Sequence, residues 1–156
     1  MMNDQNSQKN VAKADKQMRD DLTKIEEIKN KVKAFQDKRG WGNESPKDIS
    51  LSIVLEAAEL LEHFQFKSGR EVEEEARLFG PICDELSDVL WWIMSMANRL
   101  NIDVAQAFER KYKYNEDKYP ESIFASTMTD EEKRKKYYKI KAKYRGSHPL
   151  ADKQDD

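Results

Sequence analysis

The spacing of apolar residues is the feature that most constrains this chain, because it is helical in segment after segment. Ile25, Ile28, Val32 and Phe35 lie three or four residues apart, which is the spacing of one face of a helix. The sequence contains no stretch of alternating apolar and polar residues typical of a strand. It therefore predicts an all-α fold.

Glycine and proline divide this pattern into separate helices. The loop RGWGNESP ends the first helix, and Ser45 followed by Pro46 and Asp48 has the signature of a helix start. Gly80-Pro81 and Pro120 are further breaks. The predicted helices cover residues 22–39, 46–68, 70–79, 82–100, 103–118 and 129–145. The four long central helices predict a core that resembles a four-helix bundle.

Length and composition predict one helical domain with two ends of different character. A chain of 156 residues most simply forms one domain. Residues 1–17 are polar and are predicted to be a flexible tail. Residues 18–120 hold the predicted helical domain. Residues 121–156 form an extension, with a basic helix and an end, GSHPLADKQDD, predicted to be disordered.

Charge and cysteine content exclude several classes of protein. The net charge of −2 argues against a general nucleic-acid binder. No apolar run approaches the roughly 20 residues that a membrane-spanning helix needs, and the N-terminus lacks the apolar core of a secretion signal. The single cysteine, Cys83, permits no internal disulfide, and its apolar neighbour predicts a small core residue. We expect a cytoplasmic location.

Carboxylates occupy a narrow strip on the second predicted helix. A helix turns by 100° per residue. In the segment LEAAELLEHF, residues 55–64, this turn places Glu56, Glu59 and His63 on one side of the helix, which Ser52 of the preceding turn shares. Almost every other position on this helix is apolar, which reverses the proportions of an ordinary surface helix. The pattern predicts a mostly enclosed helix whose acids occupy a slot.

The segment DELSDVLWWI, residues 84–93, repeats this arrangement. Glu85 and Asp88 share a strip with Trp92. Two such helices, packed together, would bring four carboxylates into one slot, where a divalent cation would offset their repulsion. Oxygen ligands favour Mg²⁺, Mn²⁺ or Ca²⁺ over zinc.

Two other interpretations of these acids remain open from the residues alone. Acid pairs three apart also occur on solvated helices, so spacing by itself does not establish a metal site. A di-iron bundle requires Glu-x-x-His on two helices. Here His63 follows Glu59 by four residues and His148 lies in the tail, so a di-iron centre is disfavoured.

Four segments in order resemble a known family. FQDKRGW, SPKDISLSIVLEAAELLEHFQF, DELSDVLWWIMSMANRLNID and KYKYNEDKYP are similar to motifs of the MazG-like, all-α nucleotide pyrophosphohydrolases, in particular the branch that hydrolyses dCTP. The resemblance runs from residue 35 to residue 120, a little over half of the chain. It implies a dimeric or tetrameric helical bundle that uses Mg²⁺, with Mn²⁺ as the alternative, to hydrolyse a nucleoside triphosphate to the monophosphate and pyrophosphate.

The resemblance also implies a set of site residues. The metal would be held by two acid pairs, Glu56 with Glu59 and Glu85 with Asp88. The residues implied for phosphate binding are Lys111, Asn115, Lys118 and Tyr119, and those implied for base contacts are Trp41, Phe66 and Trp92.

Two positions depart from the family pattern. Many relatives have tryptophan at the position that Phe66 occupies in this sequence, and arginine at the position of Lys118. Lysine keeps the charge but loses the planar two-pronged grip on phosphate. Both departures bear on which base is preferred.

The residues also favour a mechanism. A triphosphate in an acidic slot requires a metal to balance the charge. Glu56 or Glu59 would then position or deprotonate the attacking water.

The apolar surfaces of the two acid-bearing helices predict an oligomer. A non-catalytic alternative rests on the basic C-terminal helix, with Tyr137, Tyr138 and Tyr144 among its lysines. This helix would bind nucleic acid or an acidic partner. Truncation at Thr129 separates the two functions.

Overall fold

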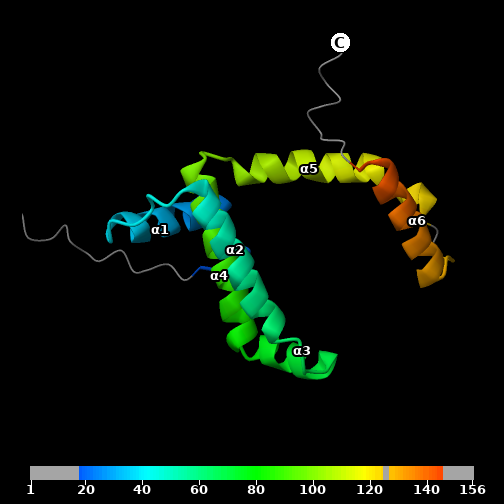
Figure 1. Cartoon of the computed structure of the whole chain (residues 1–156), viewed down its shortest axis with the longest axis horizontal. Helices are drawn as coiled ribbons and strands as arrows, with labels where there is room; N and C mark the ends of the chain where they lie inside the picture. The colour runs from blue at the N-terminus through cyan, green and yellow to red at the C-terminus, as the bar shows by residue number, and fades with distance from the viewer. Residues whose placement is uncertain (1–17, 125–126, 146–156) are drawn as a thin grey trace, which may run out of the picture. The chain divides into compact units, whose positions relative to one another are not determined.

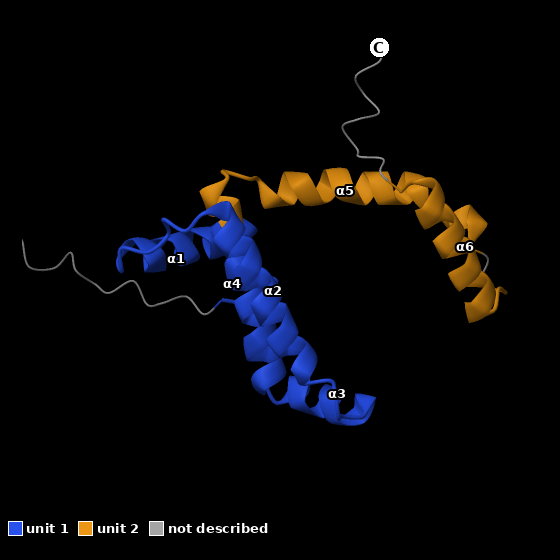
Figure 2. Ribbon diagram, viewed as in Figure 1, with its two compact units in different colours: residues 1–95 blue, residues 96–156 orange. Residues whose placement is uncertain are grey.

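Helices account for the secondary structure of the computed structural model, which describes residues 18–124 and 127–145. No strand occurs within these two ranges, which confirms the all-α prediction. The chain divides into two compact units, the first ending at Ser95 and the second starting at Met96 (Figure 2). The predicted tail 1–17 and the end 146–156, with His148, lie outside the described residues.

Four helices make up the first unit. They are α1 (Ile25–Asp37), α2 (Pro46–Glu62), α3 (Gly69–Arg77) and most of α4 (Pro81–Arg99) (Figure 1). α2 and α4 lie side by side, and the short α3 connects them. The acid-bearing segments of the sequence are therefore on two adjacent helices.

α1 is fixed to α4 by a small mixed contact. The Gln36 side-chain amide donates a hydrogen bond to Ser95 Oγ at 3.0 Å, and both side chains are buried. Beside them the rings of Phe35 and Trp91 meet edge to face, with centroids 4.9 Å apart. A buried, hydrogen-bonded polar pair favours one register of the two helices.

Serine caps set the helix boundaries around the site. Ser45 accepts a hydrogen bond from the Asp48 amide and Pro46 occupies the first turn of α2, as predicted. The predicted continuation of this helix to residue 68 is wrong, because α2 ends at Glu62. Ser68 has extended backbone and caps α3 through a capping box with Glu71, so the chain leaves the α2 axis before it.

The second unit contains the end of α4, α5 (Val104–Lys118), a short 3₁₀ turn, η1 (Glu121–Ile123), and α6 (Asp130–Lys143). Asn101 adopts a left-handed conformation with φ of 53°, which ends α4. Asp103 then caps α5 by accepting from the Gln106 amide at 2.9 Å.

The prediction that α2 is enclosed is wrong for this chain. Leu51, Val54 and Leu55 are 54%, 64% and 62% exposed, and only Ile49 of α2 is buried. The polar strip is instead the side that faces α4, because Glu56 contacts this helix. The first unit therefore places Glu56 against α4 and leaves apolar side chains of α2 at the surface.

No helix in the described ranges is both long and apolar enough to cross a membrane.

Candidate metal centre

Three of the four predicted metal ligands meet between α2 and α4. Glu56, Glu59 and Glu85 each offer a carboxylate oxygen, and these oxygens lie within 4.8 Å of one another. Glu56 and Glu59 share one face of α2 because they are three residues apart. Glu56 and Glu85 are half-buried, whereas Glu59 is exposed. The fourth predicted ligand, Asp88, is exposed and lies outside this group of three.

The charges in this acidic cluster, defined as Glu56, Glu59 and Glu85, repel one another. The negative charge of Glu56 is the largest cause that raises the pKa of Glu59 above its usual value, followed by burial and by the charge of Glu85. Asp88 adds a smaller effect in the same direction, so its charge also acts on the cluster. A cluster of carboxylate oxygens fits a hard cation such as Mg²⁺ or Mn²⁺.

Trp92 holds one of these carboxylates in place. Its indole N–H donates a hydrogen bond to Glu56 Oε1 at 3.1 Å. Hydrogen bonds from neighbouring groups orient metal ligands and affect their affinity for the ion. The sequence placed Trp92 on the acid strip but did not predict this bond, and the predicted contact of Trp92 with a base stays a prediction.

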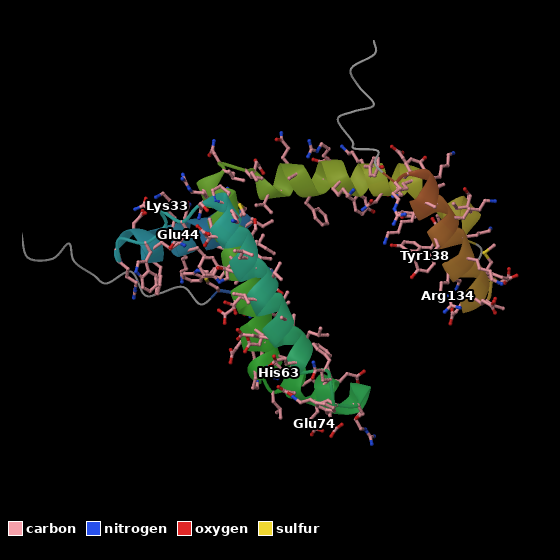
Figure 3. All side chains as sticks on the ribbon, viewed as in Figure 1. Lys33, Glu44, His63, Glu74, Arg134 and Tyr138 are labelled. Atoms are coloured by element: carbon pink, nitrogen blue, oxygen red, sulfur yellow. The ribbon has the colours of Figure 1, made fainter. Side chains whose placement is uncertain are left out.

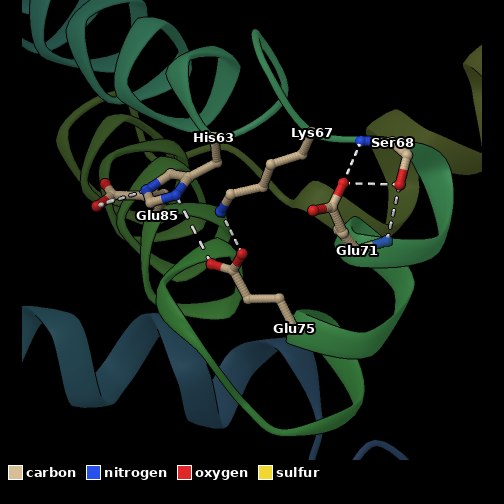
Figure 4. A network of polar contacts seen from close by, with 6 residues as sticks. All are labelled: His63, Lys67, Ser68, Glu71, Glu75 and Glu85. Carbon is tan, nitrogen blue, oxygen red and sulfur yellow. Dashed lines mark hydrogen bonds and ion pairs between the residues drawn. The ribbon is translucent and has the colours of Figure 1, made fainter.

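His63 connects the acidic cluster to α3. Its ring lies between two carboxylates, with Nε2 3.8 Å from Glu85 Oε1 and Nδ1 3.7 Å from Glu75 Oε1 (Figure 4). Lys67 forms an ion pair with the other oxygen of Glu75, and this hydrogen bond is the main reason that the pKa of Glu75 is lowered. The side chain of His63 lies where α2 ends beside α3 (Figure 3).

Gly80 allows the α3–α4 turn to close over Glu75. A Cβ at Gly80 would lie 2.7 Å from Glu75 Cγ and 3.1 Å from the Glu75 carbonyl oxygen. The glycine that the sequence analysis treated as a helix breaker therefore also allows the close approach that places Glu75 beside His63. Sequence reasoning missed Glu75, because only the turn brings α3 back to the end of α2.

Two predicted base-contact residues lie in loops of the first unit. Trp41 follows α1, packs its ring against Phe35 with centroids 6.0 Å apart, and is 57% exposed. Phe66 lies in the turn after α2 and is 96% exposed. Their roles stay predictions.

The predicted phosphate-binding residues all belong to the second unit. Lys111, Asn115 and Lys118 lie on α5, and Tyr119 directly follows it. The Lys111 ammonium lies 4.5 Å from the centre of the Tyr114 ring. These residues and the acidic cluster belong to different units, and the phosphate-binding roles stay predictions.

The fold and the acidic cluster place this chain among the all-α proteins that carry a group of carboxylates between two adjacent helices. The profile of the MazG-like family matches residues 51–141, and the chain belongs to this family. The match confirms the resemblance found in the sequence. It also extends beyond Pro120 into α6, which the four segments did not cover.

Individual relatives agree with this assignment. The chain is similar to dCTP pyrophosphatase 1 from Mus musculus (33% identical over 100 residues, 62% of this chain and 59% of the relative) and from Homo sapiens (30% over 107 residues, 66% and 63%). It thus spans about three fifths of their length. The crystal structure of a pyrophosphatase from Archaeoglobus fulgidus DSM 4304 superposes with a TM-score of 0.56 and 34% identity, over 67% of this chain and 99% of that chain.

We predict that Trp92→Phe weakens divalent-metal binding by about tenfold, in the range found for lost hydrogen bonds to metal ligands. Phenylalanine keeps an aromatic ring but cannot donate to Glu56. Titration of Mg²⁺ or Mn²⁺ into the metal-free protein measures the effect. Trp41→Phe is the matched control and should bind the metal as the wild type does. Unchanged metal affinity in Trp92→Phe would show that the hydrogen bond does not orient a ligand.

We predict that Glu59→Gln stabilises the metal-free protein at neutral pH. Because the pKa of Glu59 is raised in the native state, the native state binds more protons than the unfolded state at pH values just above the ordinary pKa of glutamate. The protein therefore loses stability as the pH rises through these values, and glutamine at position 59 removes this loss. Thermal unfolding in a chelator measures the gain, which should disappear below about pH 4, where both states are protonated.

Glu74→Gln removes one charge from an exposed position of α3 and is the control. An equal gain in that variant would assign the effect to net charge rather than to the cluster.

Proposed function

We propose that this protein is a metal-dependent nucleoside triphosphate pyrophosphohydrolase that releases pyrophosphate and a nucleoside monophosphate. The observation that carries the proposal is the meeting of Glu56, Glu59 and Glu85 within 4.8 Å in a MazG-like chain. Relatives named dCTP pyrophosphatase and pyrophosphatase support the reaction class. They also support a dCTP-like substrate.

In this proposal the carboxylates bind the metal, and one of them also acts on the attacking water. Glu56, Glu59, Glu85 and Asp88 hold Mg²⁺, with Mn²⁺ as the alternative. A bound divalent metal polarises the phosphoryl group and lowers the pKa of a coordinated water. The hydrogen bond from Trp92 fixes Glu56 as a ligand. This leaves the exposed Glu59 as the better placed carboxylate to orient or deprotonate the attacking water.

The remaining residues would bind the rest of the nucleotide. Lys111 and Lys118 would offset charge on the phosphates, with hydrogen bonds from Asn115 and Tyr119. Trp41, Phe66 and Trp92 would contact the base through their rings. With lysine at position 118, the phosphate is held by a point charge rather than by a two-pronged group.

We expect Mg²⁺-dependent release of pyrophosphate from a panel of nucleoside triphosphates that includes dCTP and modified pyrimidines. Glu59→Gln and Asp88→Asn should each lower turnover by about 100-fold or more, the range for loss of a general base. Asp84→Asn removes the same charge from the first turn of α4 and should retain activity. Absence of turnover with every nucleotide, with metal present and the helices intact, would contradict the proposal and favour the interaction module.

We also propose that the active protein is a homodimer or homotetramer. The support is the exposed apolar side of the acid-bearing helices, with Val54 and Leu55 on α2 and Leu86, 58% exposed, on α4. Large apolar patches mark interfaces, and a second copy would present the same helices to it.

Light scattering at micromolar concentration should give a multiple of 18.3 kDa. Leu55→Asp should lower the measured mass, because it places a charge within the apolar side. Leu78→Asp, at a residue 76% exposed just beyond α3, is the matched control and should leave the mass unchanged. A wild-type monomer would contradict the proposal.

A further inference from the structure

A cavity of about 420 Å³ lies in the second unit between the end of α5 and the last turns of α6. It is lined by Lys118, Tyr138, Lys141, Ala142, Tyr144 and Arg145. Three of these residues are cations, two are tyrosines, and none is a carboxylate. The volume falls within the range of about 300–1,000 Å³ typical of small-molecule sites.

Aromatic contacts hold the two helices together around this pocket. The rings of Tyr119 and Tyr137 stack with centroids 5.4 Å apart and an interplanar angle of 17°. Tyr114 and Tyr144 meet edge to face at 6.3 Å. Lys136 Nζ donates to the Ile123 carbonyl at 2.8 Å, which attaches α6 to the turn before it. The pocket therefore lies between two packed helices, with Tyr144 and Arg145 in the turn that follows α6.

Lys118 is placed among rings. Its ammonium lies 5.2 Å from the ring centres of Tyr119 and Tyr144 and 5.9 Å from that of Tyr114. Cation–π contacts of this kind hold a lysine in place without removing its charge. The charge remains available to an anion that enters the pocket.

The acids of α6 do not offset the charge of the pocket. They lie in its first turn, where Asp130 and Glu131 pair with Lys133 and Lys135. In the described ranges, no ion pair within 4.0 Å joins a carboxylate to Lys118, Lys141 or Arg145.

The two helix ends reduce this positive charge only in part. α5 ends at Lys118 and α6 ends at Lys143, and a helix C-terminus carries about half a negative charge. Three cations against two such ends leave the pocket positive. Its lining therefore favours an anionic ligand.

We propose that this pocket binds a short polyphosphate chain, and that Lys141 of α6 and Arg145, two residues beyond the end of α6, act together with Lys118 as its ligands. Arg145 offers the planar fork that matches phosphate oxygens, which Lys118 by itself lacks. The hydroxyl of Tyr138 adds a hydrogen-bond donor. The same chemistry occurs in a nucleoside triphosphate and in free pyrophosphate, and naming these two sources rests on the proposed function.

Calorimetric titration of inorganic pyrophosphate into the full chain, in a chelator that removes divalent metal, tests the pocket. We expect wild-type binding that weakens by about tenfold or more in Lys141→Ala/Arg145→Ala, because two charge-assisted contacts are lost. Arg134→Ala/Lys139→Ala removes one lysine and one arginine from the same helix outside the pocket. This control should bind as the wild type does, and circular dichroism checks that both doubles remain helical.

A dCTP titration distinguishes the two sources. Tighter binding of dCTP than of pyrophosphate, lost in the pocket double, identifies the nucleotide as the ligand, and the opposite order identifies the product. Equal effects of the two doubles on binding, or no pyrophosphate binding by the wild type, would overturn the proposal. If the pocket double lost binding of an oligonucleotide but not of pyrophosphate or dCTP, the proposal would be overturned and nucleic acid would be the ligand.

This binding needs neither metal nor turnover. Failure of the proposed activity would leave it intact, and failure of the pocket would leave metal binding at the acidic cluster intact.

Discussion

Repulsion among the carboxylates of the acidic cluster is the constraint on which the arrangement of the first unit depends. α2 and α4 place Glu56, Glu59 and Glu85 within 4.8 Å, and the charge of Glu56 raises the pKa of Glu59. Such a contact costs free energy unless a cation or a hydrogen bond offsets it. The hydrogen bond from Trp92 offsets part of the repulsion. A bound divalent cation would offset more of it.

The contact between the polar strip of α2 and α4 has a consequence for the opposite side of α2. Since the polar strip of α2 faces α4, its apolar residues face outward, with Leu51, Val54 and Leu55 more than half exposed. In an ordinary surface helix the apolar stripe would face the core. The acidic cluster and the exposed apolar side are therefore two consequences of one arrangement of residues.

Much of the fold could be predicted from local signals. The Ser45 cap, the break at Gly80 and the cap at Asp103 set helix boundaries through interactions within a few residues. The end of α2 could not be placed in the same way. Its apolar pattern continues past Glu62, and the cap at Ser68, which begins another helix, prevents α2 from continuing there.

The sequence by itself determined the all-α class and which acids share a helix face, because helical periodicity and spacing are local properties. The family followed from the resemblance of four segments to known motifs. Only the tertiary structure decided that Trp92 donates to Glu56 and that His63 lies between Glu85 and Glu75. It also decided that Lys118 shares a pocket with Arg145. These contacts join residues on different helices, and how helices pack depends on shape and charge over the whole unit.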